Sequence, residues 1–233
     1  MVNKRLKKGQ QDGLLPPNIC FLCGTLTGSN RLLCVPCLGD LGTIEQACCR
    51  CGTPMIHPGT CPGCNARPPK YDQIIVPFRY SYPVSLLIKL LKYKNNFELA
   101  RELGVALAEK ISARGQPLPE AVLPVPLHPL RTLARGYNQA QEIADIVAVE
   151  LKLPVENALI RRTRHTRPQF DLDPAARRRN IRGAFRLVRQ PEYRSIALVD
   201  DVVTTGTTVN EIAALLKRSG LGTVEVWACA RAG

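Results

Sequence analysis

Two adjacent carboxylates, Asp200 and Asp201, follow an apolar run in the stretch SIALVDDVVTTGTTVNEIAALLKRSG, which covers residues 195–220. Next come Gly206, a helical pattern and four threonines around the glycine, namely Thr204, Thr205, Thr207 and Thr208. Backbone N–H groups at a helix start favour a phosphate, and glycine lets the backbone approach it closely. Two carboxylates would repel that phosphate unless they hold hydroxyl groups or a Mg²⁺-bound group. The stretch therefore predicts a ribose 5-phosphate site, with the acids on the ring hydroxyls and the loop on the phosphate.

Cysteines form the second group of residues suited to chemistry, because nine of the ten lie between residues 20 and 64. Eight of them make C-x2-C pairs: Cys20 and Cys23, Cys34 and Cys37, Cys48 and Cys51, Cys61 and Cys64. Two such pairs supply four thiolates for a tetrahedral Zn²⁺, and that unit occurs twice. We therefore expect one or two structural zinc ions, with a redox or iron–sulfur role as the alternative. The spacing leaves open whether the pairs combine sequentially or crosswise, and whether Cys49 or His57 replaces a ligand.

Charge and composition narrow the class of protein. The formal net charge is +13, from 32 Lys and Arg against 19 Asp and Glu, which predicts an anionic partner or a solvated basic face. The basic start MVNKRLKKGQQDG has no apolar run behind it and does not resemble a secretory signal. No segment has the length of a membrane span. We therefore expect a cytoplasmic protein without membrane insertion, whose cysteines bind metal and do not form disulfides.

Composition divides the chain into a basic tail (1–15), a double zinc ribbon (16–68) and a larger domain (69–233). In the larger domain, apolar runs typical of strands alternate with stretches of helical periodicity. The helical stretches are residues 85–112, 137–152 and 207–220, and the expected strands are 121–127, 155–162, 195–199 and 223–230. This alternation predicts an α/β fold, a parallel sheet flanked by helices. Ligands of such sheets bind at the carboxyl ends of the strands, where Asp200 and Asp201 are expected.

The stretch ALVDDVVTTGTTV resembles the phosphoribosyl pyrophosphate (PRPP) signature of type I phosphoribosyltransferases, a hydrophobic strand followed by two acids and a Thr/Gly loop. Two further segments, PVPLHPLRTLARGYNQA (124–140) and TRPQFDLDPAARRRNIRGAF (166–185), together with the paired C-x2-C motifs, resemble the ComF/GntX family. Members of that family are bacterial proteins that join a zinc ribbon to a phosphoribosyltransferase-like domain, and they are linked to competence and to use of external DNA. The resemblance covers nearly all of the chain after residue 16.

The resemblance implies roles for particular residues. Asp200 and Asp201 would bind the ribose hydroxyls, and the loop Thr204, Thr205, Gly206, Thr207 and Thr208 would bind the 5-phosphate. The turn with Arg131, Arg135 and Gly136 matches the position of the pyrophosphate-binding loop. The segment 163–182 matches the mobile loop that closes over the site, and its candidates to face the pyrophosphate are Arg164, Arg167 and Gln169. The predicted catalytic set is thus Asp200, Asp201, Arg135, Arg164 and Arg167.

Two functions follow from the resemblance. The first is Mg²⁺-dependent transfer of phosphoribose from PRPP to an unidentified acceptor, within DNA uptake and utilisation. This reaction needs no nucleophilic side chain, because Mg²⁺ and arginines stabilise the departing pyrophosphate. The alternative is a non-catalytic scaffold of the DNA-uptake machinery that senses PRPP or binds single-stranded DNA beside other competence proteins. The arginines of residues 161–189 suit either partner, pyrophosphate or nucleic acid, or a solvated surface.

Overall fold

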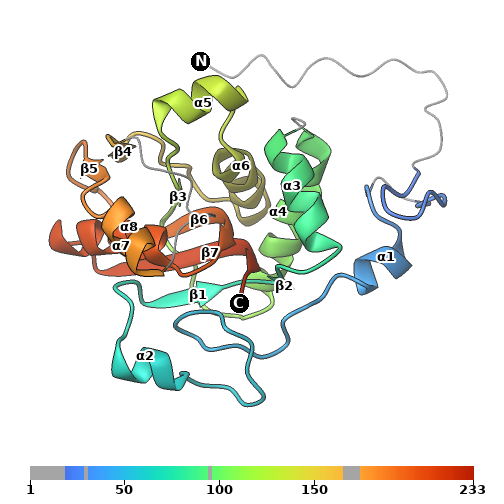
Figure 1. Cartoon of the computed structure of the whole chain (residues 1–233), viewed down its shortest axis with the longest axis horizontal. Helices are drawn as coiled ribbons and strands as arrows, with labels where there is room; N and C mark the ends of the chain where they lie inside the picture. Colours follow the sequence, from blue (N-terminus) through green and yellow to red (C-terminus); the bar gives the residue numbers. More distant parts are fainter. Residues whose placement is uncertain (1–18, 29–30, 94–95, 165–173) are drawn as a thin grey trace. The chain divides into compact units, whose positions relative to one another are not determined.

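A computed structural model of the chain describes residues 19–28, 31–93, 96–164 and 174–233 (Figure 1). The chain forms two compact units, residues 1–39 and residues 40–233. The first unit carries the first four paired cysteines and helix α1 (Val35–Gly39). The second unit carries the other four together with the whole α/β domain. The predicted division at residues 68–69 separates both cysteine sets from the larger domain, whereas the compact units divide after Gly39.

Backbone hydrogen bonds explain why the second cysteine set belongs with the α/β domain. The N–H of Ile74 donates to the carbonyl of Cys49 at 3.0 Å, and the N–H of Ile44 donates to the carbonyl of Pro77 at 2.8 Å. These bonds join the cysteine-rich segment to the first strands of the sheet. Its short helix α2 (Pro62–Ala66) begins directly after Cys61.

The main sheet of the second unit is parallel, as predicted. Its strand order is β1-β7-β6-β3, and β2 also pairs with β7. The strands are β1 (Gln73–Ile75), β2 (Phe78–Arg79), β3 (Ala121–Pro124), β6 (Ser195–Val203) and β7 (Thr223–Arg231). The helices are α3 (Val84–Tyr93), α4 (Phe97–Ser112), α5 (Pro129–Arg135), α6 (Gln139–Leu151), α7 (Pro174–Ile181) and α8 (Thr207–Arg218). The central strands β6 and β7 are buried along most of their length.

Helices cover both faces of this sheet. Alternate residues of β6, Ile196 and Leu198, share one core cluster with Ile212 and Leu216 of α8. Successive side chains of a strand point to opposite faces, so the residues between them face the other side. There α4 and α6 pack on each other and on β7, β6 and β3, and the Sγ of Cys229 lies 3.9 Å from the carbonyl oxygen of Leu103. The fold is therefore α/β and type I phosphoribosyltransferase-like, as the sequence predicted.

Two expected elements differ in detail. The helical stretch 85–112 forms the two helices α3 and α4, because the side chain of Asn96 accepts a hydrogen bond from the N–H of Leu99 and caps α4. The strand expected over 155–162 forms only as β4 (Ile160–Arg162). It pairs antiparallel with β5 (Phe185–Leu187) in a separate two-stranded sheet. In the parts of the chain that the structure describes, no helix has the length and apolarity to cross a membrane.

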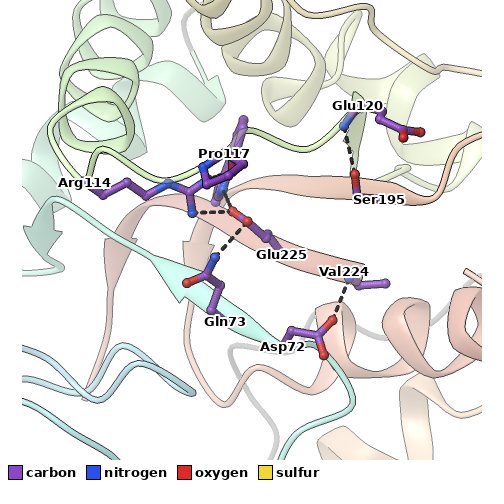
Figure 2. A network of polar contacts seen from close by, with 9 residues as sticks. Asp72, Gln73, Arg114, Pro117, Glu120, Ser195, Val224 and Glu225 are labelled. Atoms are coloured by element: carbon purple, nitrogen blue, oxygen red, sulfur yellow. Dashed lines mark hydrogen bonds and ion pairs between the residues drawn. The ribbon is translucent and has the colours of Figure 1, made fainter. Parts of the chain in front are cut away.

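A buried carboxylate organises the amino end of the sheet. Glu225, at 4% exposure, accepts hydrogen bonds from Gln73 Nε2 at 2.8 Å and Trp227 Nε1 at 2.7 Å, and it pairs with Arg114 at 2.8 Å. Figure 2 shows the contacts of Glu225 with Gln73 and Arg114. Three donors satisfy a charge that would be costly to bury alone. Glu225 therefore stabilises the end of the sheet that is opposite the predicted ligand site.

Replacing Gly104 by alanine is expected to separate α4 from α6. A Cβ there would lie 2.8 Å from Cγ2 and 2.9 Å from Cβ of Ile146. Overpacking of this kind costs about 1–3 kcal/mol, which exceeds the gain of about 1 kcal/mol from helix propensity. Urea unfolding should therefore show a less stable variant. A gain in stability would mean that the two helices can separate freely at this contact.

Candidate functional site

The two predicted acids lie at the carboxyl end of β6 but point to opposite faces of the sheet. Asp200 lines a shallow, open hollow with residues at the end of β6 and of the following loop and helix: Val202, Val203, Thr204, Gly206, Thr207, Thr208 and Val209. Asp201 is 8% exposed and pairs with Nζ of Lys92, on α3, at 2.6 Å. The structure therefore brings Asp200 together with the predicted phosphate loop and holds Asp201 against α3. Adjacent positions in a strand require this separation.

The loop between β6 and α8 has the backbone geometry that its glycine predicts. Gly206 is the N-cap residue of α8 and has φ +70° and ψ 5°, in the left-handed region. The Oγ1 atoms of Thr205 and Thr207 lie 2.7 Å apart and share a hydrogen bond. The loop therefore places small hydroxyl side chains beside the N-terminus of α8, where the helix dipole favours an anion.

The pKa values of Asp200 and Lys92 depend on burial, on each other's charge and on that of Asp201. Burial and the neighbouring charge of Asp201 raise the pKa of Asp200 to about 8, and Lys92 opposes that shift. Burial alone would lower the pKa of Lys92, but Asp201 and Asp200 outweigh it and raise that pKa. The cation of Lys92 thus stays with Asp201, and Asp200 holds a proton near neutral pH in the free protein. A ligand that offers hydroxyl groups to Asp200 would favour its ionised form.

The raised pKa of Asp200 predicts a pH dependence of folding. An unfolded aspartate has a pKa of about 3.9, so between about pH 4 and pH 8 the folded state binds more protons than the unfolded state. The free energy of unfolding should therefore fall as the pH rises through this interval, and the effect should level off above it. Urea unfolding at pH 5, 7 and 9 should show this decline in the wild type and a weaker one in Asp200→Asn. Equal slopes in the two proteins would contradict the assignment.

Three residues that sequence reasoning missed support the loop. A Cβ on Gly206 would lie 3.4 Å from the Oη of Tyr71, which is buried at 3% exposure. Asn210 Oδ1 accepts a hydrogen bond from the N–H of Lys70 at 2.7 Å, so the segment before β1 is fixed to the start of α8. Arg231, the last residue of β7, donates to the carbonyl of Val203 at 3.3 Å. The only sequence signal for Arg231 was its position at the end of an expected parallel strand. No sequence signal pointed to Tyr71 or Asn210.

The predicted pyrophosphate turn after β3 forms the short helix α5. Gly136 ends this helix with φ +79°, and its N–H donates to the carbonyl of Thr132 at 2.7 Å. Arg135 Nη1 donates to Gln139 Oε1 at 3.1 Å, so its guanidinium lies against the start of α6. Arg131 is in α5, and its side chain is outside the described part. The role of this turn in binding pyrophosphate stays a prediction.

The predicted closing segment connects β4 to β5 and contains α7. Arg164 Nη1 donates to the carbonyl of Arg182 at 2.8 Å, which joins the two ends of the segment. The N–H of Gly183 donates to Glu211 Oε1, on α8, at 2.9 Å. The other two candidates, Arg167 and Gln169, lie outside the described residues.

The paired cysteines gather into two four-cysteine clusters in sequential order. One contains Cys20, Cys23, Cys34 and Cys37, the other contains Cys48, Cys51, Cys61 and Cys64, and within each cluster all sulfurs lie within 4.8 Å of one another. The Sγ atoms of Cys23 and Cys34, and of Cys51 and Cys61, are 3.6 Å apart. Tetrahedral ligands about 2.3 Å from Zn²⁺ would be about 3.8 Å apart. Both clusters therefore fit structural zinc, and Cys49 and His57 are outside them.

Both clusters use the same backbone turn at their first pair. Gly24 and Gly52 have φ of +75° and +71°. Their N–H groups donate to the carbonyls of Cys20 and Cys48 at 2.9 and 2.8 Å. This repetition extends the sequence repeat to the three-dimensional structure, as expected of two zinc ribbons.

Comparison with known proteins agrees with this architecture. A family model described as a double zinc ribbon domain matches residues 11–69. Competence protein F of Haemophilus influenzae is 36% identical over 222 residues, which are 91% of this chain and 96% of that protein. DNA utilization protein YhgH of Escherichia coli K12 is 35% identical over 224 residues, which are 94% of this chain and 99% of that protein. The similarity thus extends across both the cysteine clusters and the α/β domain.

Solved phosphoribosyltransferase structures also match part of the chain. Adenine phosphoribosyltransferase from Leishmania tarentolae matches with a TM-score of 0.37 and 16% identity, covering 69% of this chain and 76% of that one. Orotate phosphoribosyltransferase from Aeropyrum pernix matches with a TM-score of 0.34 and 22% identity, covering 60% and 62%. The strand order of the sheet and the loop before α8 define the fold.

Proposed function

The chain belongs to the ComF/GntX family, and we propose that it binds PRPP with Mg²⁺ at the carboxyl end of β6 and acts in the uptake and utilisation of DNA. The observation that carries the ligand is the hollow in which Asp200 meets the loop before α8. The role in DNA uptake rests on the names of the relatives, a competence protein and a DNA utilization protein.

Different residues around the hollow would bind different parts of PRPP. Asp200, once ionised, would accept hydrogen bonds from ribose hydroxyls, and backbone N–H groups of Thr205 to Thr208 would donate to the 5-phosphate. Asp201, paired with Lys92 on the other face of β6, would fix the end of this strand and thereby the position of Asp200. Mg²⁺ would be held mainly by the pyrophosphate oxygens of PRPP. When bound, it would neutralise charge on the departing pyrophosphate.

Transfer would proceed by displacement at the anomeric carbon. The bond from C1 to the pyrophosphate oxygen breaks, a bond from C1 to the acceptor forms, and the acceptor loses its proton. The transition state has oxocarbenium character, so positioning and charge stabilisation by Arg135, Arg164 and Arg167 would replace a nucleophile. Pyrophosphate release should be measured with purine and pyrimidine bases, amines and DNA ends as acceptors. Release with one acceptor class would support transfer, whereas no release with any of them would favour binding alone.

A second candidate function is a scaffold that binds single-stranded DNA, favoured by the basic surface. The net charge is +13, and exposed arginines lie in β4, in β5 and in the segment between them: Arg161, Arg164, Arg179, Arg182 and Arg186. Contacts to phosphates make affinity fall steeply with salt. Fluorescence anisotropy with a labelled oligonucleotide at 50 and 200 mM salt tests this function. Negligible affinity at both concentrations would exclude it.

The metal clusters suit a reducing compartment. Eight thiolates held for zinc would be open to oxidation to disulfides in an oxidising compartment, so we propose that the protein acts in the cytoplasm. Contact with other competence proteins is proposed from the name of the relative in Haemophilus influenzae alone. The clusters would contribute folding free energy and no chemistry, because four cysteines leave no open coordination position.

A further inference from the structure

Arg231 lies between the second cysteine cluster and the loop proposed to bind the 5-phosphate. On the cluster side, its Nε donates to the carbonyl oxygen of Cys51 at 2.7 Å, and its Nη2 donates to Thr53 Oγ1 at 3.4 Å. Cys51 belongs to the cluster itself. The direction of this carbonyl therefore depends on how the cysteine is held.

On the loop side, a single nitrogen of the same guanidinium contacts the backbone. Nη1 contacts the carbonyl oxygens of Val203, at 3.3 Å, of Thr204 and of the neighbouring Ala232. Val203 is the last residue of β6 and Thr204 is the first residue of the loop. The rigid, planar guanidinium thus joins the two sites directly, which a flexible lysine could not do.

The turn of the cluster is packed tightly against Val76, which follows β1. A Cβ on Gly52 would lie 3.0 Å from Cγ2 of Val76 and at the ordinary contact distance of 3.6 Å from Cδ of Arg231. A change at the cluster therefore reaches the guanidinium mainly through its hydrogen bond to the carbonyl of Cys51.

The geometry of the peptide group relates the contacts of Arg231 to the N–H groups that would bind the ligand. In a trans peptide the C=O and the following N–H point in opposite directions. The carbonyl of Val203 also accepts from the N–H of Ala232 at 3.0 Å, whereas the contact of Arg231 with the carbonyl of Thr204 fixes the direction of the N–H of Thr205. This N–H is among the groups proposed to bind the 5-phosphate.

We propose that Arg231 is a positioning residue through which metal binding at the second cysteine cluster sets the geometry of the 5-phosphate loop. This inference rests on the proposed PRPP function for its ligand. The inference concerns PRPP binding and not the transfer step, so it does not depend on which acceptor is used. PRPP affinity should consequently require zinc at the second cluster, although no zinc ligand touches PRPP.

The test is a cycle of variants in the full-length protein. PRPP affinity, with Mg²⁺ present, is measured by calorimetry for the wild type, Arg231→Ala, Cys64→Ser and the double variant. Each single change should weaken PRPP binding by roughly 5-fold or more. The PRPP affinity of the double variant should be close to that of whichever single variant binds PRPP less tightly. Independent effects that multiply in the double variant would overturn the proposal.

Matched variants separate coupling from loss of stability. Cys37→Ser removes the corresponding fourth ligand from the other cluster, and Arg114→Ala removes an ion pair at the opposite end of β7. Both should lower stability and keep PRPP affinity within about twofold of the wild type. In Arg231→Lys the charge remains but the bridge is lost, so its PRPP affinity should not respond to Cys64→Ser. A response as large as in the wild type would contradict the role of the guanidinium.

A second readout needs no PRPP. Hydrogen exchange of the peptide covering residues 203–209 should become faster in Arg231→Ala and in Cys64→Ser, and should stay unchanged in Arg114→Ala. If the wild type fails to bind PRPP but these exchange rates change as stated, the proposed ligand is wrong and the coupling stands. If the wild type binds PRPP and the exchange rates do not change, the coupling is wrong and the proposed function stands.

Discussion

Replacing Asp200 by asparagine is expected to weaken PRPP binding about 10- to 100-fold, because hydrogen bonds to a charged partner are worth about 1.5–3 kcal/mol. The free protein should fold at least as well at pH 8. Desolvation and Asp201 raise the pKa of Asp200 to about 8, so the wild-type side chain is half protonated there and asparagine imitates its neutral form. Calorimetry at pH 8 with Mg²⁺ measures the binding, and urea unfolding measures the stability.

The neighbouring acid supplies the matched comparison. Asp201→Asn leaves Lys92 without the carboxylate that it contacts at 2.6 Å, so we expect this variant to lose stability as well as PRPP affinity. The two substitutions should differ in their effects on stability, because the two acids lie on opposite faces of β6. Equal PRPP affinity in Asp200→Asn and the wild type would exclude Asp200 from the ribose site.

Replacing Cys48 by serine is expected to remove one of two bound zinc ions per chain and to lower the free energy of unfolding by several kcal/mol. Structural zinc contributes about 10–16 kcal/mol of apparent binding free energy in small zinc-dependent folds. Cys48 is fully buried in its cluster, and its segment also contacts β1 through the carbonyl of Cys49. Metal content by mass spectrometry and thermal unfolding together check the result.

Cys49→Ser is the control for this change. Cys49 is the next residue, is exposed and lies outside both clusters, so the variant should keep two zinc ions and nearly wild-type stability. A Cys48→Ser protein that still binds two zinc ions, or a Cys49→Ser protein that loses one, would contradict the ligand assignment.

The sequence predicted those parts of the fold that depend on local patterns. The run SIALV and its neighbours predicted a parallel sheet with Asp200 at a carboxyl end, and both are observed. The spacing of the cysteines predicted two four-thiolate units but left their combination open. The structure resolves it, because the sulfurs of two sequential pairs lie within 4.8 Å of one another in each cluster.

Contacts between residues far apart in the chain leave no local pattern in the sequence. Lys92, Tyr71 and Arg231 reach the site from elements far apart in the chain, and no periodic pattern relates them to residues 200–208. The short strand β4 was expected in the parallel sheet, yet its partner β5 is set by tertiary packing. The opposite directions of Asp200 and Asp201 did have a signal, since neighbours in a strand face opposite sides.

The central claim, that the loop before α8 binds PRPP, is tested most directly by unfolding the wild-type protein with and without this ligand. PRPP at 100 times its dissociation constant should raise the free energy of unfolding by about 2.7 kcal/mol. The effect should require Mg²⁺ and should fall to about 1.4 kcal/mol or less at the same PRPP concentration in the Asp200→Asn/Asp201→Asn double variant, because an affinity that is at least about 10-fold weaker leaves PRPP at no more than about 10 times its dissociation constant. Unchanged wild-type stability across millimolar PRPP with Mg²⁺ would contradict the account and leave the loop a structural part of the fold.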